Sequence, residues 1–138
     1  MKNFVLYVLP LVAFMGVIFY LSSRESFPIV MPEWVYYFDK IVHAAIFGFL
    51  ALLFIRNWTR GDIAAFTMQA FVATIVFASL YGITDEFHQR FVPGRTPDVL
   101  DWVADTTGAV VMCSLFFWRR SVVLSRGGIN TGIDRIKG

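Results

Sequence analysis

The chain has 138 residues, of which 57% are apolar and only 16% are charged, whereas an ordinary soluble domain carries roughly 25% charged residues. This composition argues against a soluble or a disordered protein, and the length leaves room for four or five membrane helices of about 20 residues each. The net charge of +2 and the single cysteine, Cys113, identify neither a partner nor a compartment.

The first predicted span covers residues 4–21, which carry no charge and follow Lys2. This run is longer than the apolar region of a signal peptide and has no small-residue cleavage site behind it, so a retained span is favoured. Pro10 is expected to kink the helix, which membrane helices tolerate. The second span is predicted over residues 34–55, with the helix starting near Glu33.

The third span is predicted over residues 63–83, and its helix is expected to continue as far as Gln89. Two prolines and a glycine make residues 92–97 a turn. The fourth span is predicted over residues 99–118, with Asp98 as its N-cap. The expected fold is therefore all-α: a membrane domain over residues 1–118 that forms a four-helix bundle, followed by a flexible basic tail over residues 119–138.

The basic residues indicate the orientation, because cytoplasmic loops are enriched in Lys and Arg. With both termini on one side, that side would hold eight basic residues: Lys2, Arg56, Arg60, Arg119, Arg120, Arg126, Arg135 and Lys137. The other side would hold four basic residues and eight of the ten acidic residues. Both termini are therefore predicted to be cytoplasmic.

Pairs of small residues four apart occur in the second, third and fourth spans. They are Ala44 with Gly48, Ala78 with Gly82, and Ala104 with Gly108. Such pairs let helix backbones approach closely in lipid. Each pair lies beside polar residues, so close packing here is expected to bring those polar groups together, with the apolar first span as a supporting helix.

Acidic residues within predicted spans are unusual, and here they all lie towards one leaflet. Such groups are costly in a bilayer and indicate a functional site by default. Residues three or four apart share a helix face, and three polar faces result: Asp39 with His43; Asp85 with Gln89; Asp98 with Asp101 and Asp105. We expect the three faces to converge in a polar cavity that opens outward.

A histidine among carboxylates with an arginine nearby fits three kinds of chemistry. These are acid–base catalysis, binding of a hard divalent cation, and binding of a headgroup whose phosphate or carboxylate meets Arg95. The candidate catalytic residues are His43, Asp85, Glu86 and Asp101. The candidate ligand-binding residues are Asp39, Lys40, Gln89, Arg95, Asp98 and Asp105. No zinc motif or phosphate-binding glycine loop is present, so the sequence identifies no metal and no cofactor.

The same residues also have structural interpretations. Asp98 suits an ordinary helix cap, and Asp39 with Lys40, or Glu86 with Arg90, can form ion pairs at the membrane edge. The histidine and the inner aspartates of the fourth span can form a hydrogen-bonding network that holds helices together.

Four motifs follow one another in a fixed order between residues 39 and 111. They are Asp39-Lys40-x-x-His43, Tyr81-Gly82-x-x-Asp85-Glu86-x-x-Gln89, Pro93-x-Arg95, and Asp98-x-x-Asp101 leading to Gly108. As a set they resemble the VanZ-like family of small bacterial membrane proteins. The family pattern usually has Asn where this chain has Asp105.

The resemblance implies a process rather than a reaction. The founding member of the family is associated with resistance to teicoplanin, a glycopeptide antibiotic that acts on cell-wall precursors at the outer membrane surface. The leading hypothesis is therefore a multi-pass protein of the bacterial inner membrane whose outward cavity binds a lipid-linked or lipophilic cell-envelope ligand. Its expected partner is a membrane lipid or lipid-linked molecule, and no nucleic acid.

Two other hypotheses stay open at this point. The chain could be a small membrane hydrolase or transferase acting on an amphiphile, with His43 as base and Asp85 or Glu86 as acid or cation ligand. It could also be an accessory subunit whose polar cluster only holds the bundle together. A channel is disfavoured, because the inner halves of all four spans are apolar.

Overall fold

The computed structural model describes residues 3–25 and 33–136, apart from the side chains of Glu33, Tyr36 and residues 127–136. All regular elements in these ranges are helices: η1 (Phe4–Val8), α1 (Leu9–Ser22), α2 (Glu33–Thr59), η2 (Ile63–Ala65), α3 (Met68–Gln89) and α4 (Val99–Ile136). Of the residues used in the sequence analysis, Lys2 and Lys137 lie outside the described ranges.

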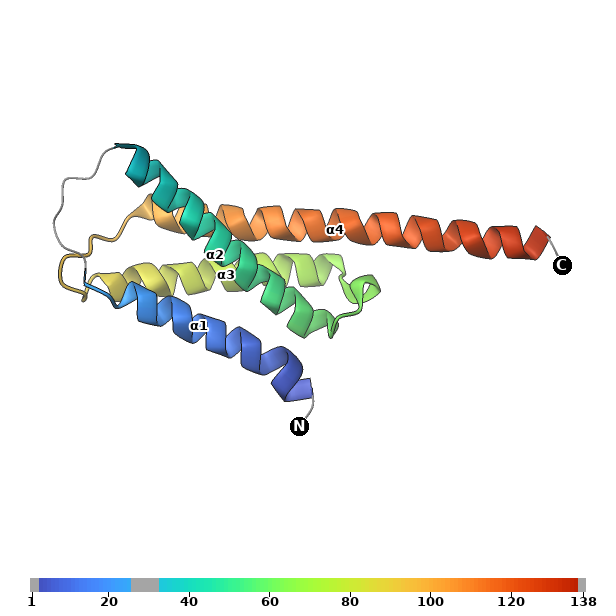
Figure 1. Ribbon diagram of the computed structural model, residues 1–138, viewed down its shortest axis with the longest axis horizontal. Coiled ribbons are helices and arrows are strands. Elements are labelled where there is room, and N and C mark those ends of the chain that lie inside the picture. Colours follow the sequence, from blue (N-terminus) through green and yellow to red (C-terminus); the bar gives the residue numbers. More distant parts are fainter. Residues whose placement is uncertain (1–2, 26–32, 137–138) are drawn as a thin grey trace.

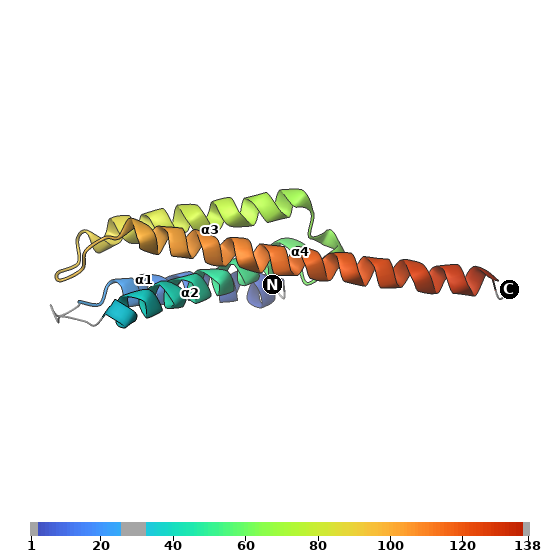
Figure 2. The same ribbon diagram turned by 90° about the horizontal axis from the view of Figure 1, so that it is seen from above.

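The helices run alternately up and down, and α4 extends well beyond the other three (Figures 1 and 2). Four of them are long and apolar enough to cross a membrane, over Phe4–Ser22, Tyr37–Thr59, Met68–Gln89 and Val99–Arg126. This confirms the predicted all-helical fold with four spans. We call the end away from both termini, where α1 and α3 finish and α2 and α4 begin, the distal end.

The third span begins later than predicted. Instead of a helix from Ile63, residues 63–65 form the short 3-10 turn η2, and α3 starts at Met68. The Asp62 carboxylate accepts a hydrogen bond from the Ala64 N–H at 2.9 Å, which caps η2. Thr67 is extended and caps α3 with its hydroxyl. Two capping side chains therefore interrupt an apolar run that by composition alone looks continuous.

The other helix ends agree with the expectations or extend past them. α2 begins at Glu33, as predicted, but continues to Thr59. α3 ends at Gln89, as predicted. α4 passes Trp118 and continues to Ile136, so much of the stretch expected to be a tail has helical backbone. Its flexibility stays a prediction.

The closest helix contact joins α2 and α4, the pair that packs most extensively. A Cβ atom added to Gly108 would lie 1.9 Å from the Ala44 carbonyl oxygen. A Cβ atom on Gly48 would lie 3.2 Å from the Gly108 carbonyl oxygen. The small residues therefore let the two backbones touch, as the sequence pattern indicates.

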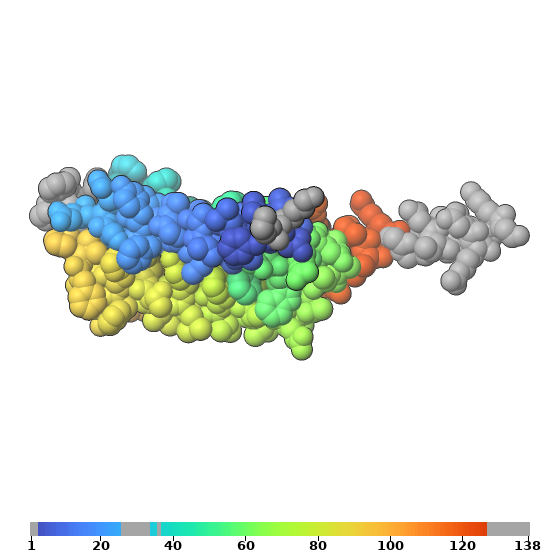
Figure 3. Space-filling view, turned by 90° about the horizontal axis from the view of Figure 1, so that it is seen from below, coloured from blue at the N-terminus to red at the C-terminus, as the bar shows by residue number. Residues whose placement is uncertain are grey.

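The first helix lies along one side of the bundle, beside α3 (Figure 3). The Tyr81 hydroxyl of α3 donates a hydrogen bond to the Met15 carbonyl of α1 at 2.7 Å. Leu11 and Ile18 of α1 are buried in the same core cluster as Phe47 and Leu50 of α2. Packing and this hydrogen bond therefore hold α1 against the other helices.

We expect Tyr81→Phe to lower the free energy of unfolding by about 1 kcal/mol, the usual net value of one intramolecular hydrogen bond. Unfolding in mixed detergent micelles, followed by circular dichroism, measures the change. Tyr20→Phe is the matched control, because Tyr20 is exposed and its hydroxyl only accepts a hydrogen bond from Arg24 at 3.3 Å. Equal effects of both substitutions would mean that the Tyr81 hydrogen bond does not stabilise α1.

Candidate functional site

Lys40 links α2 to the start of α4 at the distal end. Its Nζ atom donates to Asp98 Oδ2 at 2.7 Å and also to Asp101 Oδ1. Asp39 lies farther away, with Oδ2 at 3.8 Å from Nζ. The side chains of Lys40 and Asp101 are only 16% and 9% exposed. The predicted ion pair between Lys40 and Asp39 is therefore secondary to bonds that join two helices.

His43 lies one turn further along α2 and contacts the next polar turn of α4. Its Nδ1 atom is 3.0 Å from Asp105 Oδ1, and its Nε2 atom is 3.9 Å from Asp101 Oδ1. Asp105 is fully buried. Its second oxygen, Oδ2, has no hydrogen-bond partner among the described residues. The Asp105 carboxylate thus contacts Nδ1 of the imidazole, and the Asp101 carboxylate is the one nearer to Nε2.

The α3 part of the site consists of Asp85 and Gln89, which are both buried. Gln89 Nε2 donates to Asp85 Oδ2 at 3.1 Å. Asp85 also lines a cavity together with Asp39 and His43 of α2. The three predicted polar faces therefore meet at the distal end.

Two cavities open at this site. The first, which we call the inner cavity, has a volume of about 200 Å³ and is lined by Ile18, Leu21, Ser22, Asp39, Val42, His43, Ile46, Phe47, Asp85 and Arg95. The second, the outer cavity, has a volume of about 410 Å³ and is lined by Asp39, Lys40, Gln89, Arg95, Thr96, Pro97, Asp98 and Asp101. Asp39 and Arg95 line both cavities, so these two side chains stand where the cavities adjoin.

Two residues that line the inner cavity, Arg95 and Ser22, each carry a buried polar atom. Arg95 Nε and Ser22 Oγ are buried, and neither has a hydrogen-bond partner within the described part of the chain. Buried polar groups are normally satisfied, and each exception calls for an explanation such as a bound ligand or water. Both atoms suit a ligand that supplies hydrogen-bond acceptors.

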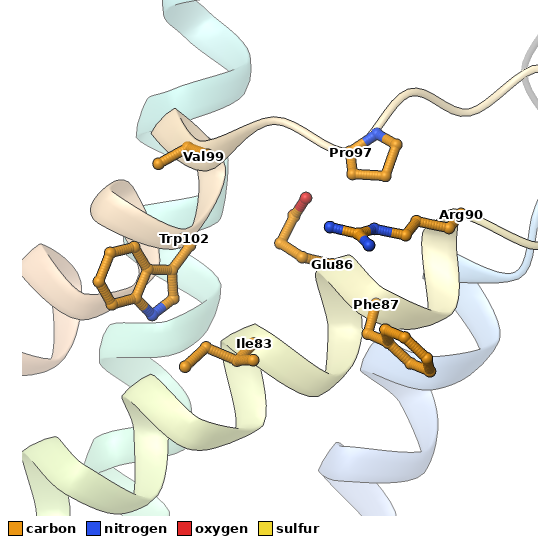
Figure 4. Close-up of a pocket in the computed structure, with 7 residues that line it drawn as sticks. All are labelled: Ile83, Glu86, Phe87, Arg90, Pro97, Val99 and Trp102. Atoms are coloured by element: carbon orange, nitrogen blue, oxygen red, sulfur yellow. The ribbon is translucent and has the colours of Figure 1, made fainter.

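Glu86 lies apart from this group. It lines a separate, largely apolar pocket of about 280 Å³ between α3 and α4, with Ile83, Phe87, Arg90, Pro97, Val99 and Trp102 (Figure 4). Its Oε2 atom accepts the Asp98 backbone N–H at 2.8 Å, and Oε1 is buried without a partner among the described residues. The described side chains of Glu86 and Arg90 form no ion pair, so that structural interpretation is not supported.

Asp98 combines two functions at the start of α4. Its Oδ1 atom accepts the Leu100 N–H at 2.9 Å, as expected of an N-cap, while Oδ2 accepts from Lys40. The predicted N-cap is therefore confirmed, and Asp98 also joins α4 to α2 through Lys40.

Several site residues carry no clear signal in the sequence. Ser22, Ile18 and Leu21 make α1 a wall of the inner cavity, whereas its uniform apolar sequence indicates only a supporting span. Ser23 Oγ lies 2.9 Å from His88 Nε2, which ties the end of α1 to α3. The only sequence feature that marks this end of α1 is the pair Ser22-Ser23 directly after the apolar run.

The arrangement suits two kinds of ligand. Three residues, Asp39, His43 and Asp101, each offer one ligand atom. These three atoms lie within 4.8 Å of one another, which is close enough to hold a metal ion. The inner cavity combines an arginine with apolar side chains, which suits an anionic amphiphile. The imidazole and its carboxylate partner would also suit general base catalysis.

Comparison with known proteins identifies a family. The family model described as VanZ/LLP1 matches residues 2–120, which include the first three spans, most of the fourth and every polar residue of the site. No curated protein and no solved structure matches the chain. Because the match covers most of the chain and agrees with the motif order, the protein belongs to the VanZ/LLP1 family.

Proposed function

We propose that this protein binds a lipid-linked or lipophilic cell-envelope ligand, with the acidic headgroup at Arg95 and the apolar tail between α1 and α2. The observation that carries the proposal is the inner cavity, which is lined by Arg95 and by several apolar side chains. The Nε atom of Arg95 is buried and has no hydrogen-bond partner among the described residues. A phosphate or carboxylate would satisfy the guanidinium with charge-assisted hydrogen bonds.

The inner cavity is lined by two kinds of side chain. The polar ones are Ser22, Asp39, His43, Asp85 and Arg95, and the apolar ones are Ile18, Leu21, Val42, Ile46 and Phe47. Of the apolar residues, Leu21 and Val42 remain 51% and 37% exposed, so part of the apolar lining belongs to the outer surface of the bundle. A volume of about 200 Å³ suits a headgroup, while the tail would lie along the exposed apolar surface.

The family and the predicted orientation support a role at the outer membrane surface. The distal end carries the acidic residues, and the excess of basic residues at the other end favours a cytoplasmic location for that end. A cavity on the outer side would face cell-wall precursors, the targets of glycopeptide antibiotics. We therefore also propose that the protein contributes to teicoplanin resistance.

We expect Arg95→Gln to weaken binding of a long-chain isoprenyl phosphate by about 10-fold to 100-fold. One hydrogen bond to a charged group contributes about 1.5–3 kcal/mol, and 1.4 kcal/mol corresponds to a factor of ten. Titration of the phosphate into the purified full-length protein in nanodiscs measures the affinity. A second titration with teicoplanin tests whether a lipophilic glycopeptide uses the same arginine.

Arg90→Gln is the matched control. Arg90 lies at the same end of the bundle but is exposed and lines the pocket between α3 and α4 (Figure 4). Its substitution should leave both affinities unchanged. Equal losses in the two variants would indicate non-specific attraction to basic side chains, and unchanged binding in Arg95→Gln would remove the proposed headgroup site.

A second candidate function, a hydrolase or transferase acting on an amphiphile, is favoured by one observation. The contact of His43 Nδ1 with the buried Asp105 orients the imidazole, as a general base requires. Asp85 lines the same cavity, whereas Glu86 does not. Mass spectrometry of isoprenyl phosphate and phospholipid substrates after incubation with the protein would detect products. Products that disappear in His43→Gln would favour an enzyme over a binding protein.

A further inference from the structure

We infer that Asp39, His43 and Asp101 form a binding site for one divalent transition-metal ion at the distal end. Their candidate ligand atoms, one imidazole nitrogen and two carboxylate oxygens, lie within 4.8 Å of one another. An ion at the centre of such a group needs distances of about 2.0–2.2 Å to nitrogen and oxygen, which small side-chain movements would provide.

The surroundings of His43 are an independent indication. Metal-binding histidines almost always donate their other ring N–H to a carboxylate, which fixes the tautomer and orients the ring. His43 Nδ1 lies 3.0 Å from Asp105 Oδ1. With the proton on Nδ1, the lone pair of Nε2 is free for a metal, and this atom is the one nearer to Asp101. Asp105 is fully buried and lies outside the three proposed ligands.

The charge around the site also favours a cation. Five aspartates line the two cavities or contact their lining residues: Asp39, Asp85, Asp98, Asp101 and Asp105. Within the described structure, two cations, Lys40 and Arg95, line the same cavities. When all five are ionised and His43 is neutral, this part of the protein has an excess of negative charge beside a low-dielectric bilayer, and a divalent ion would offset most of it.

The proposed ligands are accessible and can be released from their present partners. Asp39 is 53% exposed and lines both cavities, so an ion can enter from solvent. Lys40 contacts Asp98 as well as Asp101, so the ammonium keeps one partner if Asp101 turns to a metal. The mixed nitrogen and oxygen ligand set suits Zn²⁺ or Mn²⁺ better than Ca²⁺ or Mg²⁺, which prefer oxygen alone.

The test uses metal ions without any amphiphile, so its outcome does not depend on the proposed headgroup site at Arg95. Full-length protein in detergent is titrated with Co²⁺, whose visible absorption reports the coordination number and geometry of the bound ion, and with Mn²⁺, followed by electron paramagnetic resonance. We expect one ion per chain. Asp39→Asn and His43→Gln should each weaken binding at least about tenfold, and Asp105→Asn by about 10-fold to 100-fold.

His88→Gln is the matched control for His43→Gln, because His88 contacts Ser23 rather than a carboxylate. It should leave stoichiometry and affinity unchanged. Asp39 is half-exposed, so Asp39→Asn tests the site without disturbing the core. A folded protein that binds no Co²⁺ or Mn²⁺, or one that binds them equally well as the Asp39→Asn and His43→Gln variants, would overturn the proposal.

Discussion

Gly108→Ala is expected to lower the free energy of unfolding by at least about 2 kcal/mol, although alanine is the better helix former by about 1 kcal/mol. The added methyl group would lie 1.9 Å from the Ala44 carbonyl oxygen and 2.9 Å from the Ala44 Cα atom. These are backbone atoms, so no rotamer change can relieve the overlap. α2 and α4 would have to move apart along their most extensive contact, and overpacking of this kind costs typically 1–3 kcal/mol or more.

Gly16→Ala is the control for this experiment. Gly16 lies within α1, and nothing lies within 4 Å of a Cβ atom added there. It should therefore be neutral or slightly stabilising, because only the helix propensity changes. Unfolding of both variants in mixed micelles, followed by circular dichroism, measures the difference. A Gly108→Ala variant as stable as Gly16→Ala would mean that the α2–α4 backbone contact is looser than described.

The same contact positions the polar site. Ala44 follows His43 in the chain, and Gly108 lies one turn beyond Asp105 on α4. The His43 to Asp105 distance of 3.0 Å therefore depends on the close approach of the two backbones. Separation of the helices would lengthen this hydrogen bond, so the small residues contribute to the site without lining either cavity.

Lys40→Met is expected to have the second large effect, a loss of about 3 kcal/mol in the free energy of unfolding. Removal of one partner from a buried ion pair typically costs about 3–5 kcal/mol, because the remaining charge is left buried and uncompensated. Asp101 is 9% exposed and would lose its cation, as would the partly buried Asp98. The same micelle unfolding assay measures the loss.

A compensating variant identifies the cause. Lys40→Met combined with Asp101→Asn removes the uncompensated charge and should recover part of the stability, as a double-mutant cycle would show. Arg119→Met, on the exposed surface of α4, is the control for loss of a cation and should change stability by less than about 0.5 kcal/mol. If Lys40→Met matched Arg119→Met, the bonds between Lys40 and α4 would be only a surface feature.

Much of the fold could be predicted because the relevant signals are local. Four apolar runs of sufficient length indicate four spans, and the prolines and glycine after residue 91 indicate the turn before α4. Residue spacing placed His43 below Asp39 and Asp105 below Asp101 on shared faces. The late start of α3 was missed, because the capping by Asp62 and Thr67 lies within an otherwise apolar stretch.

The pairing between helices could not be predicted in this way. A polar residue on a helix can face several neighbours, and the rotation of each helix about its axis selects the partner. Lys40 forms its hydrogen bonds with Asp98 and Asp101 and lies farther from the adjacent Asp39. Glu86 accepts a hydrogen bond from the Asp98 N–H instead of pairing with Arg90. These choices follow from tertiary packing rather than from sequence spacing.

The sequence by itself determined the membrane class, the number of helices and the concentration of acidic residues at one end, because hydrophobicity and helical periodicity are properties of each segment. Only the tertiary structure decided that α1 completes the inner cavity, that Arg95 faces it, and that Glu86 lies in another pocket. The physical reason is that the distance between helix backbones and the rotation of each helix fix which side chains can reach one another, as the contact of Ala44 with Gly108 does for α2 and α4.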